Sequence, residues 1–103
     1  SCGGPILKPE VEALLLVPIC PHSLNDRPMV VSSSSEITLR YDSEQNVSAG
    51  IDLDGDTVSE LKMGDDLVIK KAAKSISLIH PENYDYFDNL KSKLLWGKDK
   101  RHE

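Results

Sequence analysis

The fold class follows from one stretch of sequence, Val47-Ser48-Ala49-Gly50-Ile51-Asp52-Leu53-Asp54-Gly55. Its larger apolar residues stand at every second position, which is the period of a strand with one face toward a core and one toward water. The dipeptide Asp54-Gly55 ends the stretch and supplies the positive φ angles that a two-residue hairpin turn requires. The sequence therefore predicts an antiparallel hairpin that turns at residues 54–55.

Short strands are predicted on both sides of this hairpin. Residues 11–20 are a nearly unbroken apolar run, which predicts a strand buried on both faces. Residues 29–31 start a new extended segment, and residues 36–42 alternate between polar and apolar side chains. Two more short strands are predicted near the end, over residues 67–71 and 75–79.

One helix is predicted after these strands. Pro81 and Glu82 open it, and Gly97 is placed to stop it. The apolar positions at helical spacing are Tyr84, Phe87, Leu90 and Leu94. The predicted fold class is all-β, an antiparallel β-sandwich-like domain with one carboxy-terminal helix. Residues 1–97 are expected to form this domain, and residues 98–103 a polar tail.

Composition excludes several classes of protein. The chain has 103 residues and a net charge of -5, and its Lys and Arg side chains are scattered, which argues against a nucleic-acid surface. No apolar run approaches the roughly 20 residues of a membrane span, and no signal-peptide pattern is present. Cys2 and Cys20 are expected to be reduced thiols, since a disulfide scaffold this short would carry more cysteines. We expect a soluble, cytoplasmic protein without a nucleic-acid or membrane partner.

The amino terminus is a glycine-rich turn, Ser1-Cys2-Gly3-Gly4-Pro5, with no preceding element for the turn to connect. A proteolytic or engineered fragment of a larger protein would begin in this way. We therefore expect the chain to be part of a longer one.

No constellation of residues in the chain predicts a metal site. Asp52, Asp54 and Asp56 resemble a calcium loop, but such a loop places glycine sixth and glutamate twelfth. Cys20 and His22 are donor types that zinc accepts, but no CxxC or HxxxH pair accompanies them. A solvated turn and a loop thiol are the simpler interpretations.

No constellation predicts catalysis either. A Ser/His/Asp triad can be assembled on paper from Ser23 and His22, but no nucleophile elbow is present. The Gly3-Gly4 pair lacks the context of a phosphate-binding loop, because it precedes a strand and not a helix. From the residues alone, the chain is an antiparallel β domain without catalytic machinery.

Three stretches together resemble the NAD kinase family. The first is the Ser1–Ile6 segment, which resembles the family's Ser-Ala-Gly-Gly-Pro turn with Cys2 in place of alanine. The second is Leu16-Val17-Pro18-Ile19-Cys20-Pro21-His22-Ser23-Leu24-Asn25-Asp26-Arg27-Pro28, which is similar to the family's block ending in Pro-His-(Ser/Thr)-Leu-Ser-x-Arg-Pro. The third is Leu78-Ile79-His80-Pro81 with the aromatic helix that follows, which is similar to the end of proteobacterial members. The resemblance extends from residue 1 to about residue 97.

The resemblance implies an enzyme that transfers the terminal phosphate of ATP, or of polyphosphate, to the 2'-hydroxyl of NAD to give NADP. Such a parent enzyme uses a divalent metal, Mg²⁺. The family's Gly-Gly-Asp-Gly loop, which carries the general base, and its Asn-Glu motif lie upstream and are absent from this chain. The resemblance therefore implies no catalytic or metal-binding residue in the chain, which is expected to be inactive alone.

The resemblance also implies an NAD-binding set, which is Ser1, Cys20, His22, Gly55 and Asp56. Ser1 falls on the serine that lies against NAD in the family. Cys20 and His22 fall in a loop that approaches the ligand of a neighbouring subunit, which implies a homodimer or homotetramer. Gly55 and Asp56 fall on a hairpin tip where the family commonly has Asp-Gly-Gln, so the acid at position 56 removes an amide donor. The alternative is a stand-alone β-rich protein-interaction module with no enzymatic parent.

Overall fold

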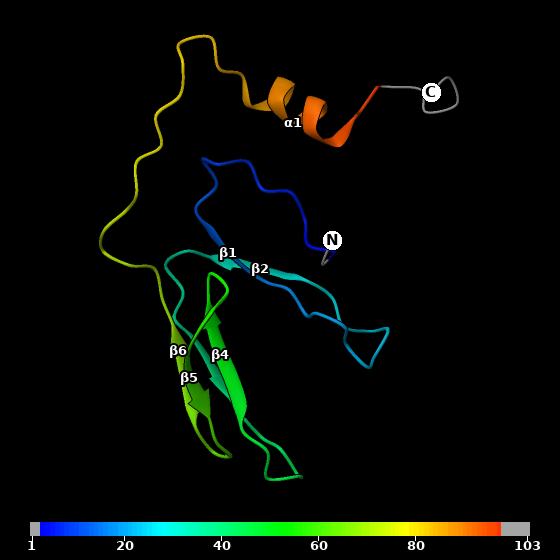
Figure 1. The fold of residues 1–103 in the computed structure, drawn as a ribbon, viewed down its shortest axis with the longest axis vertical. Helices are drawn as coiled ribbons and strands as arrows, with labels where there is room; N and C mark the ends of the chain where they lie inside the picture. Colours follow the sequence, from blue (N-terminus) through cyan, green and yellow to red (C-terminus); the bar gives the residue numbers. More distant parts are fainter. Residues whose placement is uncertain (1–2, 98–103) are drawn as a thin grey trace. The chain divides into compact units, whose positions relative to one another are not determined.

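The computed structural model describes residues 3–97 (Figure 1). Within this range the chain forms six short strands, β1 to β6, followed by the helix α1. The chain divides into two compact units, residues 1–73 and residues 74–103, so that the strands belong to the first unit and the helix to the second. The predicted polar tail, 98–103, lies outside the described residues. A single domain over residues 1–97 stays a prediction.

The six strands form three antiparallel ribbons of two strands each. The pairs are β1 (Ala13–Leu16) with β2 (Met29–Ser32), β3 (Ile37–Arg40) with β6 (Asp66–Ile69), and β4 (Ala49–Leu53) with β5 (Asp56–Leu61). Antiparallel strands and one short helix confirm the predicted fold class. An isolated two-stranded ribbon is only marginally stable in water, so each ribbon depends on what packs against it.

The hairpin predicted at residues 54–55 is confirmed. Leu53 and Asp56 are the last paired residues of β4 and β5, and only Asp54 and Gly55 lie between them. Their φ angles are 51° and 87°, so both are left-handed. Positive φ at both central residues defines a type I′ turn, whose twist matches that of the flanking strands.

The β3–β6 ribbon joins segments that are distant in sequence. Arg40 and Asp66 are opposite each other in its register, and their side chains form two hydrogen bonds. Arg40 Nε lies 2.8 Å from Asp66 Oδ1, and Nη2 lies 3.0 Å from Oδ2. Beyond the strands, the Tyr41 amide donates to the Asp65 carbonyl at 3.0 Å, and the Gly64 amide donates to the Tyr41 carbonyl at 2.9 Å.

Alternate strand residues are partly covered, as the period-two pattern predicted. On β4, Ile51 is half-buried between the exposed residues Gly50 and Asp52, and on β6, Ile69 is half-buried whereas Val68 is 51% exposed. No residue among those described is fully buried. The predicted strand over residues 11–20 exists only as β1, and its predicted burial on both faces is wrong, because Ala13, Leu14 and Leu16 are half-buried and Leu15 is 37% exposed.

The strand predicted over residues 75–79 is also wrong. No described residue of that segment belongs to a strand, and its apolar side chains are exposed. A strand needs a neighbour for its backbone hydrogen bonds, and the described chain offers this segment none.

The helix α1 (Tyr86–Leu94) begins later than the predicted start at residues 81–82. The reason is its cap: Asp85 is extended, and its side chain accepts a hydrogen bond from the Asp88 amide at 3.0 Å. The helix ends when Leu95 adopts a left-handed conformation, two residues before the predicted stop at Gly97. Among the described residues, no helix combines the length and the apolar character needed to cross a membrane.

Candidate functional site

The tip of the β4–β5 hairpin carries two of the predicted site residues, Gly55 and Asp56. A Cβ atom built on Gly55 would meet no heavy atom within 4 Å, so the space in front of the turn is open. Asp56 is the first residue of β5 and is exposed. The turn therefore presents an accessible backbone and the exposed carboxylates of Asp54 and Asp56 to anything that approaches it.

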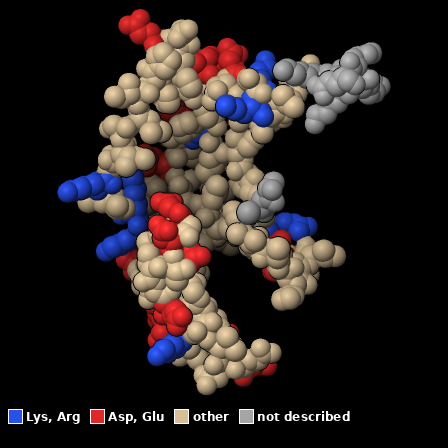
Figure 2. Space-filling view, in the orientation of Figure 1, with Lys and Arg blue, Asp and Glu red and all other residues tan. Residues whose placement is uncertain are grey.

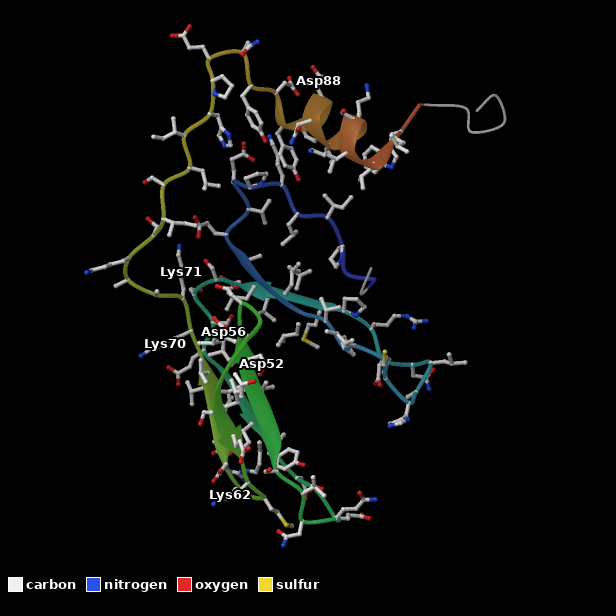
Figure 3. All side chains as sticks on the ribbon, viewed as in Figure 1. Asp52, Asp56, Lys62, Lys70, Lys71 and Asp88 are labelled. Carbon is white, nitrogen blue, oxygen red and sulfur yellow. The ribbon has the colours of Figure 1, made fainter. Side chains whose placement is uncertain are left out.

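Besides Asp54 in the turn, Asp52 and Asp56 lie near this closed end of the hairpin, and the surroundings of these two differ (Figure 3). Asp52 Oδ1 accepts a hydrogen bond of 2.7 Å from Thr57 Oγ1 on the opposite strand. The side chain of Asp56 has no hydrogen bond or ion pair with the other described residues. Asp52 thus stabilises the hairpin, and Asp56 is available to a ligand.

The β1–β2 loop carries the predicted residues Cys20 and His22. Both are exposed, and Cys20 has a left-handed φ of 50° with a free thiol. The loop is shaped by its own hydrogen bonds: the Asn25 amide donates to Ser23 Oγ at 3.1 Å, and Arg27 Nη1 donates to the Leu24 carbonyl at 2.6 Å. These bonds hold the loop locally without covering the thiol or the imidazole.

The glycine-rich turn at the amino terminus packs against the start of this loop. Ser1 lies outside the described residues, but Gly4, three positions later, is described. A Cβ atom on Gly4 would lie 3.2 Å from a methyl carbon of Val17. The close approach favours glycine at position 4 and joins two of the three stretches on which the family resemblance rests.

A hollow of about 300 Å³ lies beside this contact. Its walls are Leu16, Val17, Pro18, Arg27 and Met29. Sequence reasoning missed Arg27 as a site residue, although its guanidinium is the one charged group among the described residues that line this hollow. The pattern Asp26-Arg27-Pro28 was visible, but nothing in the sequence indicated that Arg27 faces a hollow formed by β1 and β2.

Exposed ion pairs lie at the ends of other strands. Hydrogen bonds from Arg40 lower the pKa of Asp66. The pKa of Glu12 is lowered too, mainly by a hydrogen bond from Lys71 and then by the charge of Lys71, and Ser33 Oγ donates to the same carboxylate at 3.2 Å. Because Glu12 precedes β1 and Lys71 follows β6, this ion pair connects two ribbons.

Figure 2 shows Lys and Arg side chains and Asp and Glu side chains in small, separate groups on a face that consists mostly of other residues. No continuous basic field appears on that face, in agreement with the net charge of -5.

Among residues 3–97, no group of three or more His, Cys, Asp or Glu side chains could hold a metal ion. The described residues therefore do not fit a metal site, and the three aspartates of the hairpin are no exception.

The structure brings the predicted site residues together in two groups, and no hydrogen bond or ion pair among the described residues joins the groups. One group is the hairpin tip with Gly55 and Asp56, and the other is the β1–β2 loop with Cys20 and His22. The amino-terminal turn beside Ser1 is adjacent to the second group through the contact of Gly4 with Val17. Binding of NAD by the residues of both groups remains a prediction.

Comparison with known proteins decides the family. Residues 1–81 match the ATP-NAD kinase C-terminal domain. The chain belongs to the NAD kinase family. The match includes all three segments that carry the predicted site: the amino-terminal turn, the β1–β2 loop and the β4–β5 hairpin. The predicted resemblance is confirmed.

Curated relatives agree with this assignment. The NAD kinase of Pseudoalteromonas translucida (strain TAC 125) is 46% identical over 97 residues, which is 94% of this chain and 33% of the relative. The NAD kinases of Thiobacillus denitrificans and Sulfurimonas denitrificans are 46% and 45% identical over 98 residues, covering 95% of this chain and 33% and 34% of the relatives. The chain thus spans about a third of the length of the NAD kinases it matches.

Proposed function

We propose that this chain is the carboxy-terminal part of an NAD kinase. The parent enzyme transfers the terminal phosphate of ATP or polyphosphate to the 2'-hydroxyl of NAD and releases NADP. The single observation that carries this proposal is the match of residues 1–81 to the ATP-NAD kinase C-terminal domain. The proposed activity belongs to the longer protein, because the chain covers about a third of the relatives that bear the name NAD kinase.

The proposed role of the chain is to form part of the NAD site. Gly55 and Asp56 contact the dinucleotide from the hairpin tip, where the open space in front of the turn and the unpaired carboxylate support an approach. Ser1 contacts it from the amino-terminal turn. Cys20 and His22 are exposed on the β1–β2 loop and contact the ligand of a neighbouring subunit.

Chemistry and metal binding are assigned to the part of the parent outside this chain. Phosphoryl transfer depends on a positioned base and on electrostatic stabilisation of the transferred group. The described residues include neither a base beside a phosphate site nor a metal-binding group. Mg²⁺ is therefore proposed as a cofactor of the parent, held by residues elsewhere, and the isolated chain is proposed to be inactive.

The parent is proposed to be a cytoplasmic homodimer or homotetramer. The exposed apolar side chains of the ribbons support self-association, because large contiguous apolar patches on a protein surface usually mark an interface. Leu15 and Val30 are opposite each other on one face of the β1–β2 ribbon, and they are 37% and 49% exposed. Closed two-fold pairing would cover such a face at little cost.

Activity of a chimera tests the proposal. We would join this chain to the preceding two thirds of the Pseudoalteromonas translucida relative and measure NADP formation from NAD, ATP and Mg²⁺. The chimera should form NADP, and the chain alone should not. A folded chimera without activity, beside an active parent relative, would favour the alternative of a stand-alone interaction module.

A further inference from the structure

The loop between β1 and β2, residues 17–28, holds two of the proposed NAD-binding residues with few backbone hydrogen bonds of its own. Its ends are joined, because Leu16 and Met29 are opposite each other in the β1–β2 register. Among the described residues, one backbone–backbone hydrogen bond lies inside the loop, from the Asp26 amide to the Ser23 carbonyl at 3.4 Å. Compact loops with close ends keep their shape through their own side chains.

The backbone at Cys20 needs such support. Its φ of 50° lies in the left-handed region, which residues with a Cβ atom rarely adopt. A conformation of this kind persists only where the surrounding structure holds it in place. Pro18, Pro21 and Pro28 restrict parts of the loop, since a proline ring fixes its own φ. Residues 22–27 contain no proline, so another restraint has to hold them.

Arg27 supplies that restraint. Its Nη1 donates to the Leu24 carbonyl at 2.6 Å and to the Asp26 carbonyl at 3.3 Å. A charged donor forms stronger hydrogen bonds than a neutral one. The same side chain lines the hollow of about 300 Å³ together with Val17 and Pro18 from the other arm of the loop. Arg27 therefore connects the middle of the loop, at Leu24, to the place where its two arms face each other.

We propose that Arg27 is a positioning residue for the NAD site, whose guanidinium keeps the β1–β2 loop in the shape that presents Cys20 and His22 to the dinucleotide. This inference rests on the proposed function, because it assigns Arg27 a task within the same site. Its hydrogen bonds to described residues go to carbonyl groups of its own loop, and none goes to a carboxylate. Arg27 acts through the loop and does not itself touch the substrate.

Steady-state kinetics of the full-length parent test the effect on the site. Arg27→Ala should raise the KM for NAD several-fold and leave the KM for ATP unchanged, because only the approach of the loop to the dinucleotide is lost. Arg27→Lys should restore part of the loss, since an ammonium donates to a carbonyl but lacks the planar fork of donors. Arg40→Ala is the matched control, because it removes an arginine from the β3–β6 ribbon and should leave both KM values unchanged.

Hydrogen exchange with millisecond labelling of the same variants reports on the loop itself and needs no substrate. The amides of Asn25 and Asp26 both donate to Ser23, so they record whether the loop is held. In Arg27→Ala their exchange should accelerate by about 3- to 10-fold, which is the effect of losing one hydrogen bond. Unchanged exchange in the β4–β5 hairpin shows that the variant is folded, and Arg27→Lys carries both measurements if Arg27→Ala does not fold.

The proposal requires both effects in the same variant. Faster exchange in the loop with an unchanged KM for NAD would overturn it, because the loop would then not serve the dinucleotide. A raised KM with unchanged exchange would overturn it in favour of direct contact between Arg27 and NAD, and so would an equal rise in both KM values. All three results leave the proposed function standing, whereas an unaltered parent that forms no NADP would overturn the proposed function and this inference with it.

Discussion

Replacing Gly55 by alanine should weaken the β4–β5 hairpin through backbone strain alone. Gly55 has a φ of 87°, and an added Cβ would meet no heavy atom within 4 Å. Steric contact therefore contributes nothing, and the cost is that of a left-handed conformation for a residue with a Cβ, about 1–2 kcal/mol. Since about 1.4 kcal/mol is a factor of ten, the equilibrium for opening the hairpin should rise by about 5- to 30-fold.

Amide hydrogen exchange of the β4 and β5 residues measures this opening directly. Gly55→Ala should accelerate exchange by that factor, whereas Gly55→Asn should accelerate it less, because asparagine tolerates the left-handed region. Gly50→Ala is the matched control: Gly50 lies on β4 without a left-handed φ and with open space around its Cβ position. Unchanged exchange in Gly55→Ala, or an equal acceleration in Gly50→Ala, would refute the type I′ turn as the cause of the hairpin.

Three further predictions concern the ribbons, the helix and self-association. Because Arg40 holds the pKa of Asp66 below its ordinary value of 3.8, their pairing stabilises the β3–β6 ribbon above that pH and is lost as the pH falls below it. The protection factors of β3 and β6, which compare exchange with the intrinsic rate at the same pH, should fall in acid, and Asp66→Asn should remove this pH dependence. Asp85→Ala should cost the helix about 0.5–2 kcal/mol and lower its helicity by circular dichroism, whereas Asp85→Ser should retain most of it. Light scattering across a dilution series in moderate salt should show self-association of the isolated chain, and a monomer throughout would assign the oligomer contacts to the rest of the protein.

Local signals in the sequence were enough to predict the β4–β5 hairpin and its turn. The turn that Asp54-Gly55 forms depends only on the four residues of the turn, so it can be predicted without knowledge of distant contacts. The pairing of β3 with β6 could not be predicted in this way, since Arg40 and Asp66 are 26 positions apart and lie opposite each other only after folding. The helix was predicted with its start four to five residues early, because the apolar spacing does not indicate which polar residue caps it.

The same reasoning explains the errors over burial. The apolar character of residues 11–20 and 75–79 predicted buried strands, and apolar sequence does indicate that a segment is covered. An apolar sequence does not show whether the residues that cover the segment belong to this chain or to the rest of a longer protein. In the described chain no residue of either segment is fully buried, and the relatives' greater length offers a source for further cover.

The sequence indicated the family to which the candidate site belongs, but it did not indicate how the residues of the site are arranged in space. The amino-terminal turn, the motif around Cys20 and His22, and the segment that starts at Leu78 indicated the family, which the comparison confirmed. The contact between Gly4 and Val17 depends on the packing of the amino-terminal turn, and the position of Arg27 on a hollow depends on the pairing of β1 with β2. Neither feature has a local sequence signal.

The central claim is that this chain contributes to the NAD side of the enzyme and not to the phosphate-donor side. The most direct test is the steady-state kinetics of the chimera carrying Ser1→Trp, with Glu60→Trp on the exposed face of β5 as the control. The account predicts that Ser1→Trp raises the KM for NAD several-fold and leaves the KM for ATP unchanged, because the indole crowds only the dinucleotide. Equal increases in both KM values, or an increase for ATP alone, would contradict it.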